Sequence, residues 1–178
     1  TLKEYAQRMQ NAVTGGGRIQ VDTYNGGTFI GSKIVNFTAT VPASVVPTIS
    51  AEQVTHVETV AGLATKFANY VQGKSKIRAT VAGTGAMIDG VSVSSIVGYE
   101  IQMNGQTYNT NDATSFELVN AGAQDIIFTV TDSRGRTASR TVSISPLAYK
   151  PPILSVLTAS RCLADGTPDD EGEFAKVT

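Results

Sequence analysis

The clearest alternation of apolar and polar residues lies in the C-terminal half of the chain. In residues 126–131, Ile126, Phe128 and Val130 fall on one side of a two-residue repeat, which is typical of a strand with one buried face. The alternation resumes over 141–145, after a turn in which Gly135 is free to adopt a positive φ. The pattern predicts a β-hairpin. Its apolar face needs a second layer to pack against, which indicates two packed sheets.

Shorter alternating segments precede this hairpin. In 95–103 the pattern predicts that Val97, Tyr99, Ile101 and Met103 face inward, and Asn104-Gly105 is a strong signal for a hairpin turn after them. The further strands are expected at 52–61, 75–82, 106–108 and 115–119. Together these segments predict an all-β chain whose centre is an Ig-like β-sandwich of about seven strands.

The N-terminal segment has a different pattern. Thr1 and Glu4 have the spacing of a capping box, and apolar residues follow at helical spacing as far as Val13. We therefore expect a short helix over about 2–13, with the glycines at 15–17 ending it. The alternative is a strand cut from its domain. Strands are expected at 18–23 and 33–41.

Prolines suggest where modules begin and end. Pro42 and Pro146, like Pro47 and Pro151, are separated by an offset of 104 residues (146 minus 42), about one Ig-domain length. Proline ends a strand and stiffens a linker. We predict tandem modules: 1–47 as the end of a preceding module, 48–148 as the complete Ig-like sandwich, and 149–178 as a proline linker and the start of a next module.

Composition and net charge exclude several classes of partner and of functional site. Hydrophobic residues make up 41% and charged residues 16% of the chain, a balance that favours a folded chain. The net charge of -1 gives no electrostatic reason to expect nucleic acid or an anionic membrane as a partner. Cys162 is the sole cysteine and His56 the sole histidine, so a zinc site is not supported. A Ser-His-Asp triad would need this one histidine, and the sequence contains no Gly-x-Ser-x-Gly motif. We expect His56 at the surface or in an edge strand. We predict no catalytic, cofactor-binding or metal residues, and no enzyme.

Four side chains are candidates for contact with a partner. Arg134 and Arg136 lie at the predicted hairpin tip, where an exposed arginine is also ordinary, and Tyr99 and Tyr108 are candidates for an aromatic surface. The composition of 165–173 would allow a calcium site, although its spacing does not match an EF-hand loop and a solvated turn is the alternative. The calcium candidates are Asp165, Asp169, Asp170 and Glu171.

Several motifs occur in a recognisable order. TVTDSRGRT follows the Asn104-Gly105 turn, and YKPPI, at 149–153, contains Pro151. Their order and spacing resemble the repeated Ig-like modules of siphophage tail minor structural proteins, from phages and prophages of Gram-positive bacteria. The resembling segments within 36–178 are 95–101, 104–108, 128–137, 149–153, Arg161 and 170–172.

The resemblance implies a virion structural protein near the tail tip, made in the host cytoplasm and extracellular after release. It would space, or take part in, host-surface attachment, with other tail proteins or copies of itself as partners and host cell-wall polysaccharide as a further one. It implies no catalytic residues. Two alternatives are a carbohydrate-binding or adhesin module of a bacterial surface protein, and an accessory domain of a cell-wall hydrolase.

Overall fold

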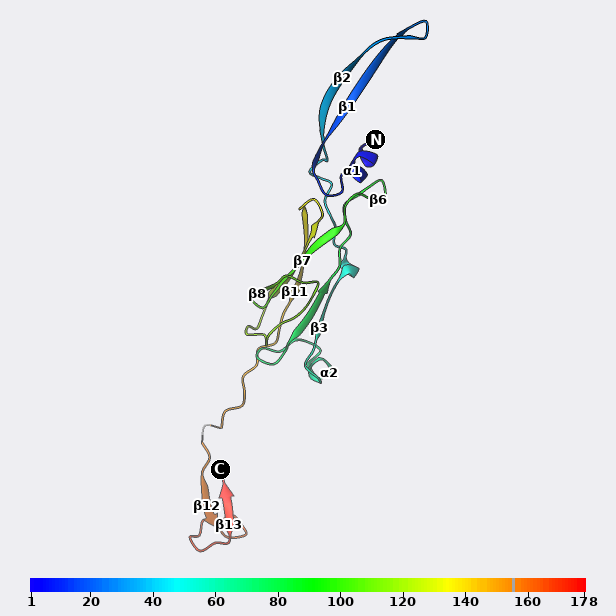
Figure 1. Ribbon diagram of the computed structural model, residues 1–178. Coiled ribbons are helices and arrows are strands. Elements are labelled where there is room, and N and C mark those ends of the chain that lie inside the picture. Colours follow the sequence, from blue (N-terminus) through cyan, green and yellow to red (C-terminus); the bar gives the residue numbers. More distant parts are fainter. Residues whose placement is uncertain (155) are drawn as a thin grey trace. The chain divides into compact units, whose positions relative to one another are not determined.

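Antiparallel β-sheets are the main secondary structure of the chain, as predicted (Figure 1). The computed structural model describes residues 1–154 and 156–178. The chain forms two compact units, Thr1–Ala148 and Tyr149–Thr178. Among the described residues, no helix is long and apolar enough to cross a membrane.

One core is shared by two sheets. The first has the order β11-β10-β7-β8 and the second the order β3-β4-β9. Phe128 and Ile101 from the first sheet and Ile77 and Ala79 from the second are fully buried in the same cluster. The strands are β3 (Val54–Glu58), β4 (Ile77–Val81), β7 (Ile96–Met103), β8 (Gln106–Tyr108), β9 (Asp112–Thr114), β10 (Gln124–Asp132) and β11 (Thr137–Ile144).

Two predicted hairpins are present. β10 pairs with β11 across a turn in which Gly135 has φ +78°. β7 pairs with β8 across Asn104 and Gly105, which both have positive φ, the combination that a type I′ turn requires.

The predicted inward position of Val97 is wrong. Its side chain is 65% exposed, because the pairing of β10 with β7 shifts between Thr131 and Asp132 and leaves Val97 unpaired. Such a bulge reverses the alternation on one side of it. Ile96 therefore packs against the core in place of Val97.

The strand predicted at 115–119 is also wrong, since β9 ends at Thr114. The side chain of Asn104 binds the backbone of this segment instead. Its amide donates to the carbonyl oxygens of Phe116 and Glu117, and its Oδ1 accepts from the N–H of Val119. Backbone bonds from the N–H of Ser115 to Ile77 and from that of Leu118 to Ser75 also hold the segment. Side-chain partners and these separate backbone bonds take the place of a continuous sheet ladder.

Besides β9, four short elements were not expected. They are the 3-10 helix η1 (Ala51–Gln53), helix α2 (Leu63–Phe67), and strands β5 (Met87–Ile88) and β6 (Val91–Ser92). β5 and β6 form a small hairpin around Asp89 and Gly90, both with positive φ. Asp-Gly between apolar residues is a hairpin signal, so the sequence did contain this turn.

The N-terminal helix α1 (Leu2–Arg8) is shorter than the predicted 2–13, although the capping box of Thr1 and Glu4 is present. The glycines at 15–17 do not end the helix. They lie within strand β1 (Thr14–Asn25), which pairs with β2 (Thr28–Thr40). A Cβ on Gly15 would lie 2.5 Å from Sδ of Met9, and one on Gly17 would lie 2.4 Å from the Phe37 ring. A side chain at either position would therefore have to displace the end of a neighbouring side chain, Met9 or Phe37.

Residues 149–178 form the second unit around β12 (Ala159–Cys162) and β13 (Phe174–Val177). The strand predicted to start at Leu154 starts only at Ala159. Cys162 is the only buried hydrophobic residue among those described in this unit. The proline linker at its start is exposed, and Ile153 has 84% of its surface accessible.

The structure does not divide at residue 47, because 1–47 and 48–148 belong to one compact unit. Val41 and Pro47, in the first proline segment, are fully buried, unlike Ile153 in the second. The tandem repetition of modules stays a prediction.

The shared core gives a stability test. Phe128→Ala should lower the free energy of unfolding by about 3–5 kcal/mol, because it removes a fully buried ring and leaves a cavity. Chemical denaturation measures the change. Val97→Ala is the control and should change stability by no more than about 0.5 kcal/mol. Equal losses in the two variants would contradict the bulged register.

Candidate functional site

The tip of the β10–β11 hairpin is buried against the N-terminal segment. Arg134, expected at an exposed turn, has only 9% of its surface accessible. Its Nε donates to the carbonyl oxygen of Met9 at 3.1 Å, and Nη2 donates to those of Ala6 at 3.0 Å and Val93. The expectation of an exposed side chain at this position is wrong. Arg134 instead binds three backbone carbonyls, two of them at the end of α1.

Arg136 binds the first proline segment in the same way. Its Nη1 donates to the carbonyl oxygens of Pro42 and Val45, both at 2.6 Å, and its Nη2 to that of Val41 at 2.7 Å. A guanidinium has several donors in a planar fork, which suits it to neighbouring carbonyls. We call Arg134 and Arg136 with these six carbonyls the arginine clamp.

Asp132 shapes the turn that carries the clamp. Its side chain is fully buried, and its Oδ1 accepts from the backbone N–H groups of Arg134 at 3.0 Å and Arg136 at 2.9 Å. Burial lowers the pKa of Arg134, and the Asp132 carboxylate opposes this shift. The ordinary pKa of arginine is so high that the guanidinium stays charged at neutral pH.

Tyr99 and Tyr108, the aromatic candidates, lie on neighbouring strands. Both are half-buried and pack against the shared core. Tyr99 also lines an open hollow with Glu100 and Thr129. Contact of these tyrosines and of the two arginines with a partner protein stays a prediction.

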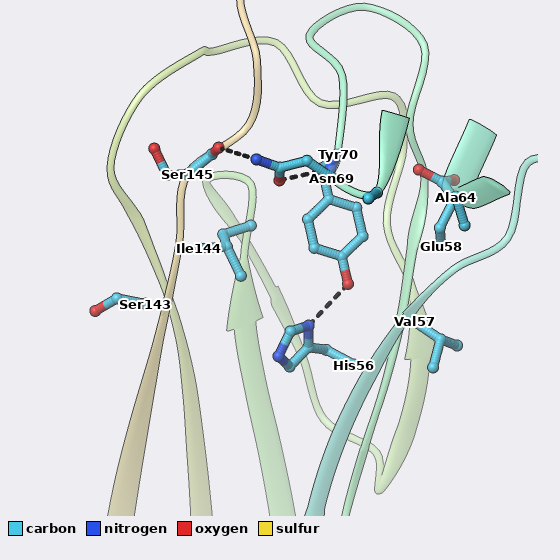
Figure 2. Close-up of a pocket in the computed structure, with 10 residues that line it drawn as sticks. His56, Val57, Glu58, Ala64, Asn69, Tyr70, Ser143, Ile144 and Ser145 are labelled. Atoms are coloured by element: carbon cyan, nitrogen blue, oxygen red, sulfur yellow. Dashed lines mark hydrogen bonds between the residues drawn. The ribbon is translucent and has the colours of Figure 1, made fainter. Parts of the chain in front are cut away.

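A pocket of about 570 Å³ opens at the other end of the sheets, beside His56 and Tyr70 (Figure 2). His56 comes from β3, an edge strand, as expected. Its Nδ1 lies 2.7 Å from the hydroxyl of Tyr70. The end of β11 and the residue after it form one wall of the pocket, through Ser143, Ile144 and Ser145.

Hydrogen bonds with the backbone position the pocket. Asn69 accepts from the N–H of Tyr70 at 2.7 Å and donates to the carbonyl oxygen of Ser145 at 3.1 Å. Glu58 Oε1 accepts from two backbone N–H groups, those of Val60 and Lys76. Within the described residues, its buried Oε2 has no partner.

The Tyr70 phenol keeps its proton over a wide pH range. Burial raises its pKa to about 12, and the Glu58 carboxylate adds to the rise. The pocket therefore presents the neutral hydroxyl of Tyr70 beside the ring of His56. Such a mixture of polar tips and apolar walls is suited to binding a neutral polar ligand. The sequence did not indicate Tyr70, because no motif joins it to His56.

The four calcium candidates do not form a cluster. Asp165 Oδ1 accepts from the N–H of Thr167, and Asp169 Oδ1 from that of Glu171, each two residues ahead. The backbone hydrogen bond from Thr167 lowers the pKa of Asp165. Among residues 1–154 and 156–178, no three His, Cys, Asp or Glu side chains are grouped to hold a metal. The acidic stretch forms turns.

Residues 1–166 match a family described as "Siphovirus protein of unknown function (DUF859)". The chain belongs to this siphovirus family. The match begins at residue 1 and so includes the segment before residue 36, which the resemblance in the sequence did not cover. Among curated proteins, none matches the chain. The family membership confirms the siphophage part of the resemblance.

The arginine clamp of this siphovirus protein can be tested by a conservative change. Arg134→Lys keeps the positive charge but replaces the guanidinium by a single nitrogen. The carbonyl oxygens of Ala6, Met9 and Val93 therefore cannot all keep a hydrogen bond from this side chain. The free energy of unfolding should fall by about 2 kcal/mol or more. Amide hydrogen exchange at Tyr5 and Met9 in α1 should become faster.

Lys66→Ala is the control for Arg134→Lys, because Lys66 is exposed on α2. It should leave both the stability and the exchange in α1 unchanged. Unchanged exchange at Tyr5 and Met9 in Arg134→Lys would show that the clamp does not hold the helix.

Tyr70 should make stability depend on alkaline pH. In the unfolded chain its phenol has the ordinary pKa of 10.0, whereas in the folded chain the pKa is about 12. Between these values the unfolded state binds fewer protons, so stability falls as pH rises. Denaturation between pH 10 and 12 should show a steeper fall for the natural chain than for Tyr70→Phe. From pH 7 to 9 the two should run parallel; identical slopes at both ranges would contradict the shift.

Proposed function

We propose that the chain is a non-enzymatic structural and interaction module of a phage tail, built around an Ig-like β-sandwich. It acts in the virion tail, where it spaces other parts or takes part in host-surface attachment. Its partners are other tail proteins, with host cell-wall polysaccharide as a further candidate.

The arginine clamp is the observation that carries this proposal. Six backbone carbonyls of residues 6–93 are bound by two side chains of the β10–β11 turn. A spacer must transmit load between the segment that enters it and its folded core, and charge-assisted hydrogen bonds to the backbone serve that purpose. Membership of the siphovirus family supports the location in the virion. The two antiparallel sheets around one core support the proposed Ig-like sandwich.

The composition of the pocket supports binding rather than catalysis. Glu58 is the only carboxylate among the residues that line it, and its Oε1 is occupied by backbone donors. Ser143 donates its hydroxyl to Asp125 at 2.7 Å, so it is not activated by His56. Glycoside hydrolysis uses two carboxyl groups across the scissile bond, and this pocket supplies one.

Immunogold electron microscopy tests the place in the virion. Antibodies raised against the 178-residue chain should label the tails of intact phage particles of a siphovirus that encodes it. Antibodies against the major capsid protein serve as the control and should label heads. Gold on heads alone, or on no particles while the antibodies recognise the denatured protein, would contradict the proposal.

The pocket favours one second candidate, a carbohydrate-binding module. The fluorescently labelled chain should bind intact Gram-positive cells saturably, and purified wall polysaccharide should compete. His56→Ala should weaken this binding about fivefold to tenfold, the worth of roughly one hydrogen bond. Gln102→Ala, on the outer face of β7, should bind like the natural chain. No binding by the folded natural chain would leave the spacer role alone.

A further inference from the structure

The β1–β2 hairpin is a two-stranded ribbon without a covering layer (Figure 1). Among the described residues, β1 and β2 pair only with each other. A hairpin of this kind is marginally stable in water unless more strands or a packing layer are added. Eight of its large hydrophobic side chains are exposed: Ile19, Val21, Tyr24, Phe29, Ile30, Ile34, Val35 and Phe37.

The two faces of the ribbon differ in chemistry. Ile19 lies opposite Val35 and Val21 opposite Lys33, so these side chains share one largely apolar face. Arg18, Gln20 and Asp22 lie on the other face. The amide of Gln20 donates to Asp22 Oδ1 at 2.9 Å, as expected for residues two apart in a strand.

The hydrogen-bonding pattern shows which backbone groups of β1 are free. At the base of the ribbon, the N–H of Val41 donates to the carbonyl oxygen of Val13. In an antiparallel pair, residues that are hydrogen-bonded to the partner strand alternate with residues whose N–H and C=O groups point away from that strand. Val13 is a hydrogen-bonded residue, and the register of β1 with β2 is unshifted from this base to Thr23. The backbone groups of Arg18, Gln20 and Asp22 therefore point to the outer edge.

We propose that the outer edge of β1 pairs antiparallel with β1 of a second copy of this chain, with Gln20 opposite Gln20. This register places Arg18 opposite Asp22 of the second copy, and Asp22 opposite its Arg18. On the apolar face it places Ile19 opposite Val21. In this register even-numbered residues of one copy lie opposite even-numbered residues of the other. The outward backbone groups of Arg18, Gln20 and Asp22 therefore meet outward backbone groups of the second copy. The product is a four-stranded sheet, β2-β1-β1-β2.

A hollow on the ribbon fits the same register. It has a volume of about 560 Å³ and is lined by Gly16, Gly17, Arg18, Asn36, Phe37 and Thr38. A Cβ on Gly16 would meet nothing within 4 Å. With Gln20 on the two-fold axis, Tyr24 of the second copy lies opposite Gly16. Its exposed ring thereby fills the open space that the glycine leaves.

Other pairings lack this complementarity. A shift of two residues along β1 separates Arg18 from Asp22 of the second copy. β2 carries a single charged residue, Lys33, so two paired β2 strands would form no ion pair of opposite charges, and lysine on an edge strand opposes pairing. The proposal does not rest on the role in the tail, and either would stand if the other failed.

Disulfide trapping tests the register in the 178-residue chain. The buried Cys162 is first changed to Ala. Gln20→Cys in this background should form a covalent dimer under mild oxidation, because the two Cα atoms would lie about 5.5 Å apart, within reach of a disulfide.

Ile34→Cys is the matched control, because Ile34 lies opposite Gln20 within the ribbon. In the four-stranded sheet two copies of Ile34 are separated by three strand spacings, about 14 Å, so no cross-link should form. Cross-linking at Ile34 equal to that at Gln20, or at neither position, would overturn the proposal.

Charge exchange tests the ion pairs by sedimentation equilibrium. Arg18→Asp should place like charges opposite each other and weaken dimerisation about tenfold or more. The double variant Arg18→Asp with Asp22→Arg should restore it to within about threefold. Both residues are exposed, so the variants should keep the natural circular dichroism spectrum. A chain that stays monomeric, or a double variant as weak as the single one, would overturn the proposal.

Discussion

The attachment of the N-terminal segment to the two-sheet core depends on hydrogen bonds between two guanidinium groups and backbone carbonyls. Helix α1 ends at Arg8, and no strand continues the chain directly after β2, so the carbonyl oxygens here have at most one local backbone donor, such as the N–H of Met9 on Ala6 and that of Val45 on Pro42. A carbonyl oxygen can accept a second hydrogen bond. Arg134 and Arg136 bind these oxygens from one tight turn. Asp132 holds the turn by accepting from the backbone of both arginines. The most regular hairpin of the chain therefore also joins the N-terminal segment to the core.

This arrangement leaves the β1–β2 ribbon supported at its base. The hydroxyl of Tyr5 lies 2.7 Å from the carbonyl oxygen of Gly15 and 2.9 Å from that of Ala39, so α1 contacts both strands where they begin and end. Beyond this contact the ribbon exposes both faces and both edges within the described structure. The core of its own chain does not stabilise this part of the ribbon, and an isolated two-stranded hairpin is marginally stable in water. Pairing with a second copy would add the strands that stabilise it.

Local hydrogen bonds, and not the arginine clamp, position the residues of the pocket beside His56. Its polar tips are fixed by local hydrogen bonds from Asn69 and Glu58 to the backbone, while its walls come from β3, the segment after α2, and the end of β11. The family membership places the chain among siphovirus proteins without assigning a role to these residues. The proposed binding role rests on the chemistry of the pocket alone, and the proposed structural role rests on the clamp.

The sequence by itself determined the strands whose signals are local. Period-two alternation gave the β10–β11 hairpin and most of β7, Asn104-Gly105 gave the turn before β8, and the capping box gave the start of α1. Only the tertiary structure decided the bulge that exposes Val97, the bonds of the Asn104 side chain to residues 116–119, and the packing of Met9 against Gly15. It also turned Arg134 inward and brought Tyr70 to His56. These outcomes depend on contacts between residues far apart in the chain or on competing hydrogen-bond partners, and neither is encoded in the periodicity of a single segment.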